Sequence, residues 1–191
     1  ISLSDTQLRS YGRVEAGFPV STHGYIRAMA SPLSAHYTFI PAIDTRFQDL
    51  TIPGGSRANV TYVFNSYRVS YLYRFWDHRR SYLQGGLVGK IRQARISVSS
   101  SQETRSYDNV GFVPLLNFAA SVPVARSTFL RFDLDGAAAR QGRAFDGSLE
   151  LFFPTAEWAE EGLSAGIRVL EGGADNSKVN TFALFQYAFL A

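Results

Sequence analysis

The three histidines are the first residues to consider for chemistry. His36 follows Ser34 by two residues in the segment SPLSAHY, and a serine beside a histidine is the pair that a nucleophilic acyl transfer requires. The sequence identifies no third residue that would orient the His36 ring. His23 and His78 lie at predicted short turns, away from such a pair. We therefore predict that the protein is not an enzyme, and we assign no catalytic residue.

Paired carboxylates are a second candidate for chemistry. Asp133 and Asp135 fall on one face of an alternating segment, where a general acid and a general base could act together. Arg131 lies on the same face, and further arginines occupy matching positions in other segments. A nearby arginine stabilises the ionised carboxylate, so these residues are better interpreted as ion pairs than as catalysts.

Oxygen ligands in the segment LEGGADNSK are a third candidate. Glu171, Asp175 and Asn176 are ligands of the kind that calcium accepts. The alternative is a tight turn in which Gly172 and Gly173 supply positive φ angles. The chain has no cysteine, which excludes thiolate metal sites, and no two histidines have ligand spacing. We expect no metal and no cofactor. These three oxygen ligands remain the one candidate for a metal site.

The elements that position these residues are predicted to be β-strands, because apolar and polar residues alternate with a period of two. In Tyr67–Phe75, large apolar residues occupy the odd positions, and arginine, serine and leucine occupy the even ones. Later segments repeat this pattern. One predicted face therefore collects a charge network of Arg68, Arg74, Lys90, Arg92, Arg131, Asp133, Asp135, Asp146, Glu150 and Arg168.

Composition supports a single domain of strands over residues 1–191. The chain contains 15 Phe, 10 Tyr and 2 Trp, a mixture that favours strands. It has no apolar run near the roughly 18 residues of a membrane-spanning helix. The net charge of +3 is small, and the arginines alternate with apolar residues instead of clustering, so no nucleic-acid partner is expected.

The predicted connections alternate between two classes. Short turns lie near Pro19–Thr22, Asp77–Arg80, Pro123–Arg126 and Pro154–Glu160, and longer or polar connections span Ser34–Arg57, Ser99–Asn109, Ala137–Gly142 and Gly172–Lys178. Transmembrane barrels alternate short periplasmic turns with longer outer loops in this way. Aromatic residues near the expected membrane boundaries would form an interfacial girdle of Tyr73, Phe75, Trp76, Tyr82, Phe153, Trp158, Tyr187 and Phe189.

The fold predicted from these patterns is all-β, an antiparallel up-and-down transmembrane β-barrel of about 8–10 strands. A charge facing hydrocarbon at the midplane would cost about 2–4 kcal/mol, so the charge network should face the lumen and the aromatic residues should face lipid. About nine strands are visible, whereas bacterial barrels normally have an even number. We expect about ten strands, with the first one missing from this sequence, or else eight.

Four phrases carry a family resemblance: FNSYRVSYLYRF, NVGFVPLLNF, the QGRAFD of DLDGAAARQGRAFD, and the LEGGADN of RVLEGGADN. From about Leu8 onward, the chain resembles a family of proteobacterial outer-membrane β-barrel proteins that has no established activity. The resemblance implies a barrel with one more strand upstream. Family members tend to end in an aromatic residue, whereas this chain ends Phe189-Leu190-Ala191. The resemblance implies no catalytic residue.

The expected function is that of a small Gram-negative outer-membrane protein, exported through the periplasm, with a charged lumen filled by side chains. It would act as a structural or interaction component, in contact with outer-membrane lipid, lipopolysaccharide and a protein partner at the outer loops or rim. The alternatives are a narrow, porin-like channel or carrier for a small anionic solute, and a lipid-modifying enzyme that uses His36. A soluble, lipocalin-like barrel would instead bury Tyr67–Phe75 and expose Arg68 and Arg74.

Overall fold

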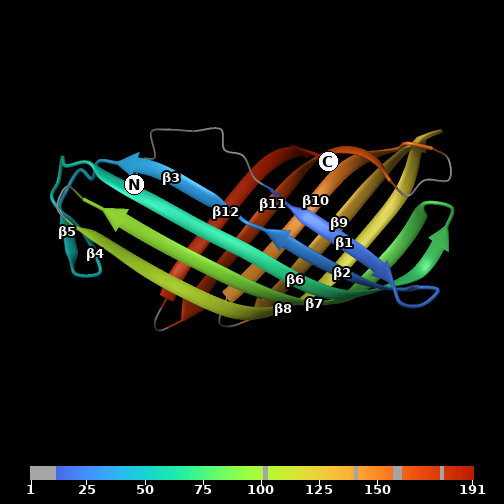
Figure 1. The fold of residues 1–191 in the computed structure, drawn as a ribbon, viewed down its shortest axis with the longest axis horizontal. Helices are drawn as coiled ribbons and strands as arrows, with labels where there is room; N and C mark the ends of the chain where they lie inside the picture. The colour runs from blue at the N-terminus through green and yellow to red at the C-terminus, as the bar shows by residue number, and fades with distance from the viewer. Residues whose placement is uncertain (1–11, 101–102, 140–141, 157–160, 177–178) are drawn as a thin grey trace. The chain divides into compact units, whose positions relative to one another are not determined.

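The computed structural model describes residues 12–100, 103–139, 142–156, 161–176 and 179–191, without the side chains of 139, 173–176 and 179–183. These residues form strands and no helix (Figure 1). The strands are β1 (Val14–Pro19), β2 (Gly24–Ser31), β3 (Ser34–Phe39), β4 (Thr45–Phe47), β5 (Leu50–Ile52), β6 (Ala58–His78), β7 (Ser81–Ser99), β8 (Thr104–Ala125), β9 (Thr128–Ala139), β10 (Gly142–Pro154), β11 (Gly162–Asn176) and β12 (Val179–Leu190). The described residues contain no helix that is long and apolar enough to cross a membrane.

The main sheet has ten strands, in the order β1-β2-β6-β7-β8-β9-β10-β11-β12, with β3 also paired to β6. From β6 to β12 the neighbours in the sheet follow the order of the chain, as in an up-and-down meander. The pairs β8–β9, β9–β10, β10–β11 and β11–β12 are antiparallel. The prediction of an all-β, antiparallel fold is therefore confirmed.

The chain divides into two compact units. The first unit comprises Ile1–Ala16, Ala28–Arg68 and Lys90–Val113, and the second comprises Gly17–Arg27, Val69–Gly89 and Pro114–Ala191. Strands β6, β7 and β8 contribute residues to both units. The expectation of a single domain stays a prediction.

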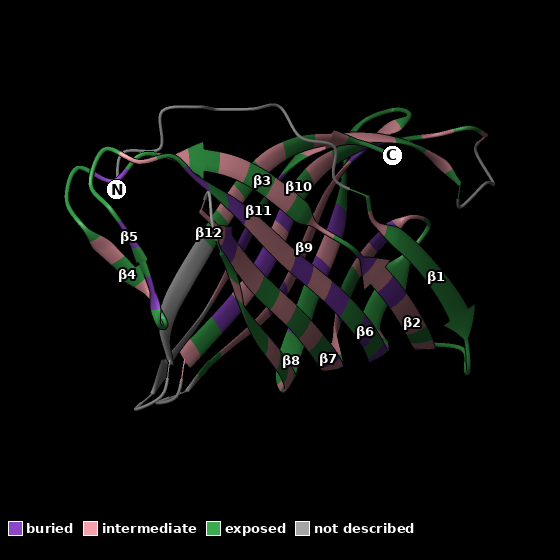
Figure 2. Ribbon diagram, turned by 60° about the vertical axis from the view of Figure 1, so that its left-hand side comes forward, coloured by how far each residue is buried: buried purple, intermediate pink, exposed green. Residues whose placement is uncertain are grey.

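Burial alternates along the strands, as Figure 2 shows by colour. In β6, Arg68, Ser70 and Leu72 are buried, whereas Val69 and Tyr71 are exposed. Successive side chains of a strand point to opposite faces of its sheet. We call the face that carries Arg68 the charged face and the face that carries Val69 the apolar face.

One glycine of β7 allows an aromatic ring to cross the backbone. A Cβ atom built at Gly85 would lie 2.8 Å from Cζ of Phe75, closer than real Cβ contacts. Glycine in a strand interior often marks such a place, where a side chain packs over the backbone.

Two connections expected from composition are instead strand. β7 continues to Ser99 and β8 begins at Thr104, so most of the predicted Ser99–Asn109 connection is paired backbone. Side-chain hydrogen bonds join Ser97 to Ser106 and Ser99 to Thr104, each at 2.8 Å. β11 likewise continues to Asn176, so the turn predicted at Gly172 does not begin there. Polar composition predicted loops at these places, but polar side chains are compatible with strands whose outer face meets water.

The irregular region between Ser34 and Arg57 folds against β6 and β7. β3 pairs with β6, where His36 lies opposite Thr61, and β4 and β5 form a separate hairpin. A buried apolar cluster holds the hairpin in place; it contains Leu50, Ile52, Ala58, Val60 and Val98, with Tyr37, Phe39, Phe47 and Ile96 packed against it. The first unit therefore contains a core of buried apolar side chains around this hairpin.

Polar contacts at the hairpin turn join it to the start of β8. Nε of Arg105 donates to Oδ1 of Asp49 at 2.8 Å, and Nε2 of Gln48 donates to the Ser106 carbonyl at 3.3 Å. Gln48 takes a positive φ of 54° at this turn. The hydrogen bond from Arg105 holds the pKa of the Asp49 carboxyl below its ordinary value of 3.8.

We predict that Arg105→Gln raises the pKa of Asp49 towards its ordinary value, as measured by carboxyl carbon NMR. Because the pKa of Asp49 is depressed in the folded state, the ion pair stabilises the fold above the ordinary pKa and is lost as the pH falls through the depressed value. Arg46→Gln is the comparison and should raise the same pKa by less, because Arg46 acts on Asp49 through its charge alone and donates its hydrogen bond to the Gln48 carbonyl. An unchanged pKa in Arg105→Gln would show that the pair does not form in solution.

Candidate functional site

The candidate site is the group of charged residues on the charged face of β8, β9, β10 and β11, all within the second unit. The strand register arranges them in three rows across the sheet. The rows are Asn117, Asp135 and Asp146; then Ala119, Asp133, Ser148 and Arg168; then Ser121, Arg131 and Glu150. Residues opposite one another in register share a face, so the charges of neighbouring strands meet.

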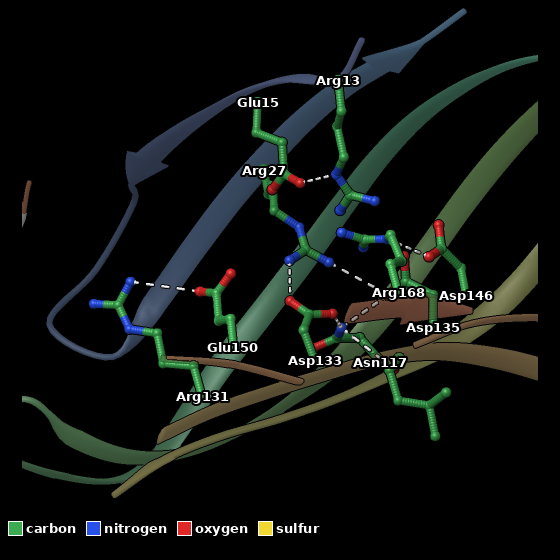
Figure 3. Close-up of polar contacts among 11 residues, drawn as sticks. Arg13, Glu15, Arg27, Asn117, Arg131, Asp133, Asp135, Asp146, Glu150 and Arg168 are labelled. Carbon is green, nitrogen blue, oxygen red and sulfur yellow. Dashed lines mark hydrogen bonds and ion pairs between the residues drawn. The ribbon is translucent and has the colours of Figure 1, made fainter. Parts of the chain in front are cut away.

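Arg27 of β2 forms the centre of the first cluster (Figure 3). Its Nη1 lies 2.5 Å from Oδ2 of Asp133, and its Nη2 lies 3.3 Å from Oδ1 of Asp135. Nδ2 of Asn117 donates to both carboxylates, at 3.0 Å to Asp133 and 2.8 Å to Asp135. Asp135 is only 1% exposed, so these donors replace the water that its charge would otherwise require.

Arg168 and Asp146 form a second pair on neighbouring strands. Nε of Arg168 donates to Oδ1 of Asp146 at 2.6 Å. The side chains are 7% and 2% exposed, so both charges are removed from water together. Such a pair tolerates burial only while both partners are present.

Arg74 and Arg131 both pack against aromatic rings. The Arg74 guanidinium lies 4.4 Å from the ring centroid of Tyr25 and 4.7 Å from that of Tyr82, and its Nη1 donates to Asp77 at 2.9 Å. Cζ of Arg131 lies 3.3 Å from the centroid of Phe152.

Three predicted network cations lie in the first unit. Nε of Arg68 donates to Oγ of Ser66 at 3.3 Å, and Nη2 of Arg92 donates to Oδ1 of Asn109 at 2.8 Å. Nζ of Lys90 lies 5.4 Å from the centre of the Phe64 ring. Arg68 and Lys90 are buried and make further interactions.

Two central residues, Arg27 and Asn117, were not assigned to the network from the sequence. Arg27 lies in the segment YIRAM, whose alternation is weak because its neighbours are small or apolar. Asn117 lies in NVGFVPLLNF, which is almost entirely apolar. No alternation in this segment marks its face from the sequence; the structure places it on the same face as the buried Leu115.

The predicted aromatic girdle is only partly found on the apolar face. Tyr73, Phe75 and Phe153 are exposed on this face, whereas Trp76, although exposed, has the parity of Arg74 in β6 and lies on the charged face. The prediction was wrong for Tyr82, which packs on Arg74, and for Tyr187, whose register partner is Arg168 on the charged face.

Phe189 is half-buried on the same face as Tyr187, while Leu184 and Leu190 of β12 are exposed. Both faces of this strand are largely apolar, so alternation alone did not distinguish them. Trp158 lies outside the described residues.

His36 belongs to a polar ladder on the exposed side of β3 and β6. Its Nε2 lies 3.3 Å from Oγ of Ser34, and its Nδ1 lies 2.9 Å from Oγ1 of Thr61. The next cross-strand pair, Thr38 and Asn59, makes a similar hydrogen bond at 2.8 Å. The partners of His36 among the described residues are hydroxyl groups, and neither is a carboxylate that could orient it as a general base.

Of the three candidate calcium ligands, only Glu171 has a side chain that the structure describes. Glu171 accepts from Nε of Arg143 at 2.7 Å. The side chains of Asp175 and Asn176 lie outside the described residues. Among the described residues, no group of three or more His, Cys, Asp or Glu side chains could hold a metal ion.

We predict that Arg168→Met lowers the free energy of unfolding by about 3–5 kcal/mol, because it leaves Asp146 buried without its ionic partner. The double variant Arg168→Met with Asp146→Leu should recover a large part of this loss. Denaturant titration of the folded protein in detergent measures both values. Arg143→Met, at an exposed pair, is the control and should cost about 0–1 kcal/mol. Equal losses in the single and double variants would contradict the role of the pair.

No family model, curated protein or solved structure matches this chain. Its function is therefore inferred from its residues and their geometry.

Proposed function

We propose that this protein spans the bacterial outer membrane as a closed antiparallel barrel and serves there as a structural or interaction component. Its apolar face contacts lipid, and its charged face forms a lumen filled by paired side chains. Its outer end contacts lipopolysaccharide or a protein partner. The resemblance to outer-membrane barrel proteins in the motif FNSYRVSYLYRF agrees with this assignment.

The observation that carries the proposal is a reversal of polarity along single strands. On one face of β6, the polar residues Asn59 and Thr61 are followed along the strand by large apolar residues: Tyr67, Val69, Tyr71, Tyr73 and Phe75. On β7, Arg95 and Gln93 give way to Ile91, Leu87 and Leu83. On β8, Ser106 and Asp108 give way to Val110 and Phe112. A change of surrounding medium, from water to hydrocarbon, explains a change of this kind within one strand.

The length of the apolar band supports the same assignment. The bands Tyr67–Phe75 and Leu83–Ile91 each extend over about nine residues. A tilted strand needs about 9–11 residues to cross the hydrocarbon core. Large apolar residues in these bands are strongly exposed, including Val69 at 62% and Leu87 at 65%. A water-soluble protein would not expose continuous bands of this size.

The soluble, lipocalin-like alternative does not fit the exposure of these residues. It requires Tyr67 to be buried and Arg68 to be exposed, whereas Tyr67 is 43% exposed and Arg68 is 3% exposed. A cation on the lipid face would cost about 2–4 kcal/mol at the midplane, and this cost explains why the charges gather on the other face.

We predict that single cysteine substitutions locate the boundary between water and hydrocarbon along β6, β7 and β8. The natural chain has no cysteine, so each substitution gives a unique label site. In lipid vesicles, a polarity-sensitive thiol dye at Val69→Cys or Leu87→Cys should be quenched by brominated acyl chains. The same dye at Thr61→Cys or Ser106→Cys should be quenched by iodide in water instead. Similar iodide quenching at all four positions would refute the transmembrane assignment.

We also predict that the folded protein does not conduct ions in planar bilayers, because paired side chains fill the charged face. The expected current trace is the same as that of protein-free lipid. Removing the bulk of the cluster with Arg27→Ala and Asn117→Ala together should permit small conductance steps. Discrete steps from the unsubstituted protein would instead favour the anion-channel alternative.

A further inference from the structure

Arg131 differs from Arg27 and Arg168 on the second unit's charged face because it makes no hydrogen bond to a carboxylate among the described residues. Its closest carboxylate oxygen, Oε1 of Glu150, is 4.0 Å from Nη1, which is beyond hydrogen-bond distance. Its Nε is buried and has no partner among the described residues. Arg27 and Arg168, by contrast, donate to carboxylates at 2.5 and 2.6 Å. Figure 3 shows Arg131 and Glu150 to one side of the Arg27 cluster.

Two further polar groups near Arg131 also lack partners among the described residues. Ser121 lies directly opposite Arg131 in the β8–β9 register, is 0% exposed, and its Oγ has no hydrogen-bond partner. Nε of Arg74 is buried without a partner as well. Arg74 is close enough to Arg131 for the two charges to repel each other. Buried donors that are left unsatisfied cost free energy, so a group of them indicates an acceptor that they are built to bind.

The surrounding aromatic rings fix the direction in which these arginines can bind. Phe152 covers one face of the Arg131 guanidinium, and Tyr25 and Tyr82 lie against that of Arg74. A guanidinium stacked on a ring keeps its N–H edge for partners in its own plane. Such an edge fits the oxygens of a phosphate, with which arginine forms paired hydrogen bonds.

The local charge also favours an anion. Arg131 experiences the charges of Arg74 and Arg80, while Glu150 and Asp77 are nearby carboxylates. Asp133 also acts on Glu150 and Tyr82, but it is paired with Arg27. Apart from that Arg27–Asp133 pair, three guanidinium groups meet two carboxylates. Glu150 also interacts with the Ser164 hydroxyl, so its charge is shared with another donor.

The site is accessible from one end of the sheet. Arg131 lies close to the start of β9 at Thr128, and Arg74 lies close to the end of β6 at His78. Their side chains are 24% and 19% exposed, whereas Asp135 is 1% exposed. A small solute can therefore reach the exposed part of each guanidinium without displacing the Arg27 cluster, whereas the buried Ser121 hydroxyl and the two Nε atoms are reached only when these arginine side chains move.

We propose that Arg131, Arg74 and Ser121 bind an oxyanion of the phosphate type, either free phosphate or the phosphate of a lipid headgroup. The two guanidinium edges and the Ser121 hydroxyl donate to its oxygens. In the topology proposed above, the site opens at the short-turn, periplasmic end of the barrel. Only this location rests on the proposed function, because the site itself is formed within the second unit.

The test is binding to the folded, full-length protein in a nonionic detergent, measured by isothermal titration calorimetry at constant ionic strength with chloride as the background anion. One arm uses inorganic phosphate, and the other uses short-chain phosphatidic acid below its micelle concentration. We expect saturable binding in at least one arm. Arg131→Gln should weaken it by about tenfold or more, because a charge-assisted hydrogen bond is lost. The matched control, Arg143→Gln, removes an exposed arginine that is paired with Glu171 and should bind like the unsubstituted chain.

The two arms distinguish the source of the phosphate. Binding of inorganic phosphate assigns a solute site, and binding of phosphatidic acid alone assigns a headgroup site. Circular dichroism verifies the fold of each variant. Ser121→Ala and Arg131→Lys are two milder single variants, and each should weaken binding several-fold. The proposal is overturned if neither ligand binds, or if the folded Arg131 variants bind as tightly as Arg143→Gln. The dye-quenching result does not depend on either outcome, so failure here would leave the membrane assignment standing.

Discussion

The pairing of buried charges on the second unit's charged face is the constraint on which the rest of that unit depends. Asp135 and Asp146 are almost completely buried, and each requires a cation within hydrogen-bond distance. The cations come from other strands, Arg27 from β2 and Arg168 from β11. A change of one residue in strand register would move these side chains to the opposite face. The ion pairs therefore specify the register as well as stabilising it.

The core around the β4–β5 hairpin and the charged face of the second unit bury opposite kinds of residue. In the hairpin core, apolar residues such as Ile52 and Val60 are buried, and polar residues such as Thr61 and Ser106 face outward. In the second, charged residues are buried and Leu149 and Ile167 are exposed. Hydrophobic burial needs surrounding water, whereas a lipid-facing wall gains nothing by hiding its apolar residues. The difference follows directly if water surrounds the first core and lipid surrounds the second.

Much of the second unit could be predicted because a period of two is easily recognised when one face is ionic. The alternation at Asp146–Glu150 and at Arg168 assigned their faces correctly. It did not assign Tyr187 or Asn117, because both faces of those segments are mostly apolar. The hairpin of β4 and β5 could not be predicted either. Its position depends on Leu50 and Ile52 packing against Val98, far along the chain, and on the Asp49–Arg105 contact.

The reversal of polarity along β6 has a consequence for how substitutions act. Under the proposed membrane assignment, the same replacement should have different effects at neighbouring levels of one strand. A charged residue at Val69 would then face hydrocarbon and destabilise the fold, whereas a charged residue at Thr61 would face water with little effect. An apolar residue at Thr61 would then extend the proposed lipid-facing band and promote association there. On this proposal, tolerance to mutation along β6 is determined by the medium at each level of the strand, and residue type alone does not predict it.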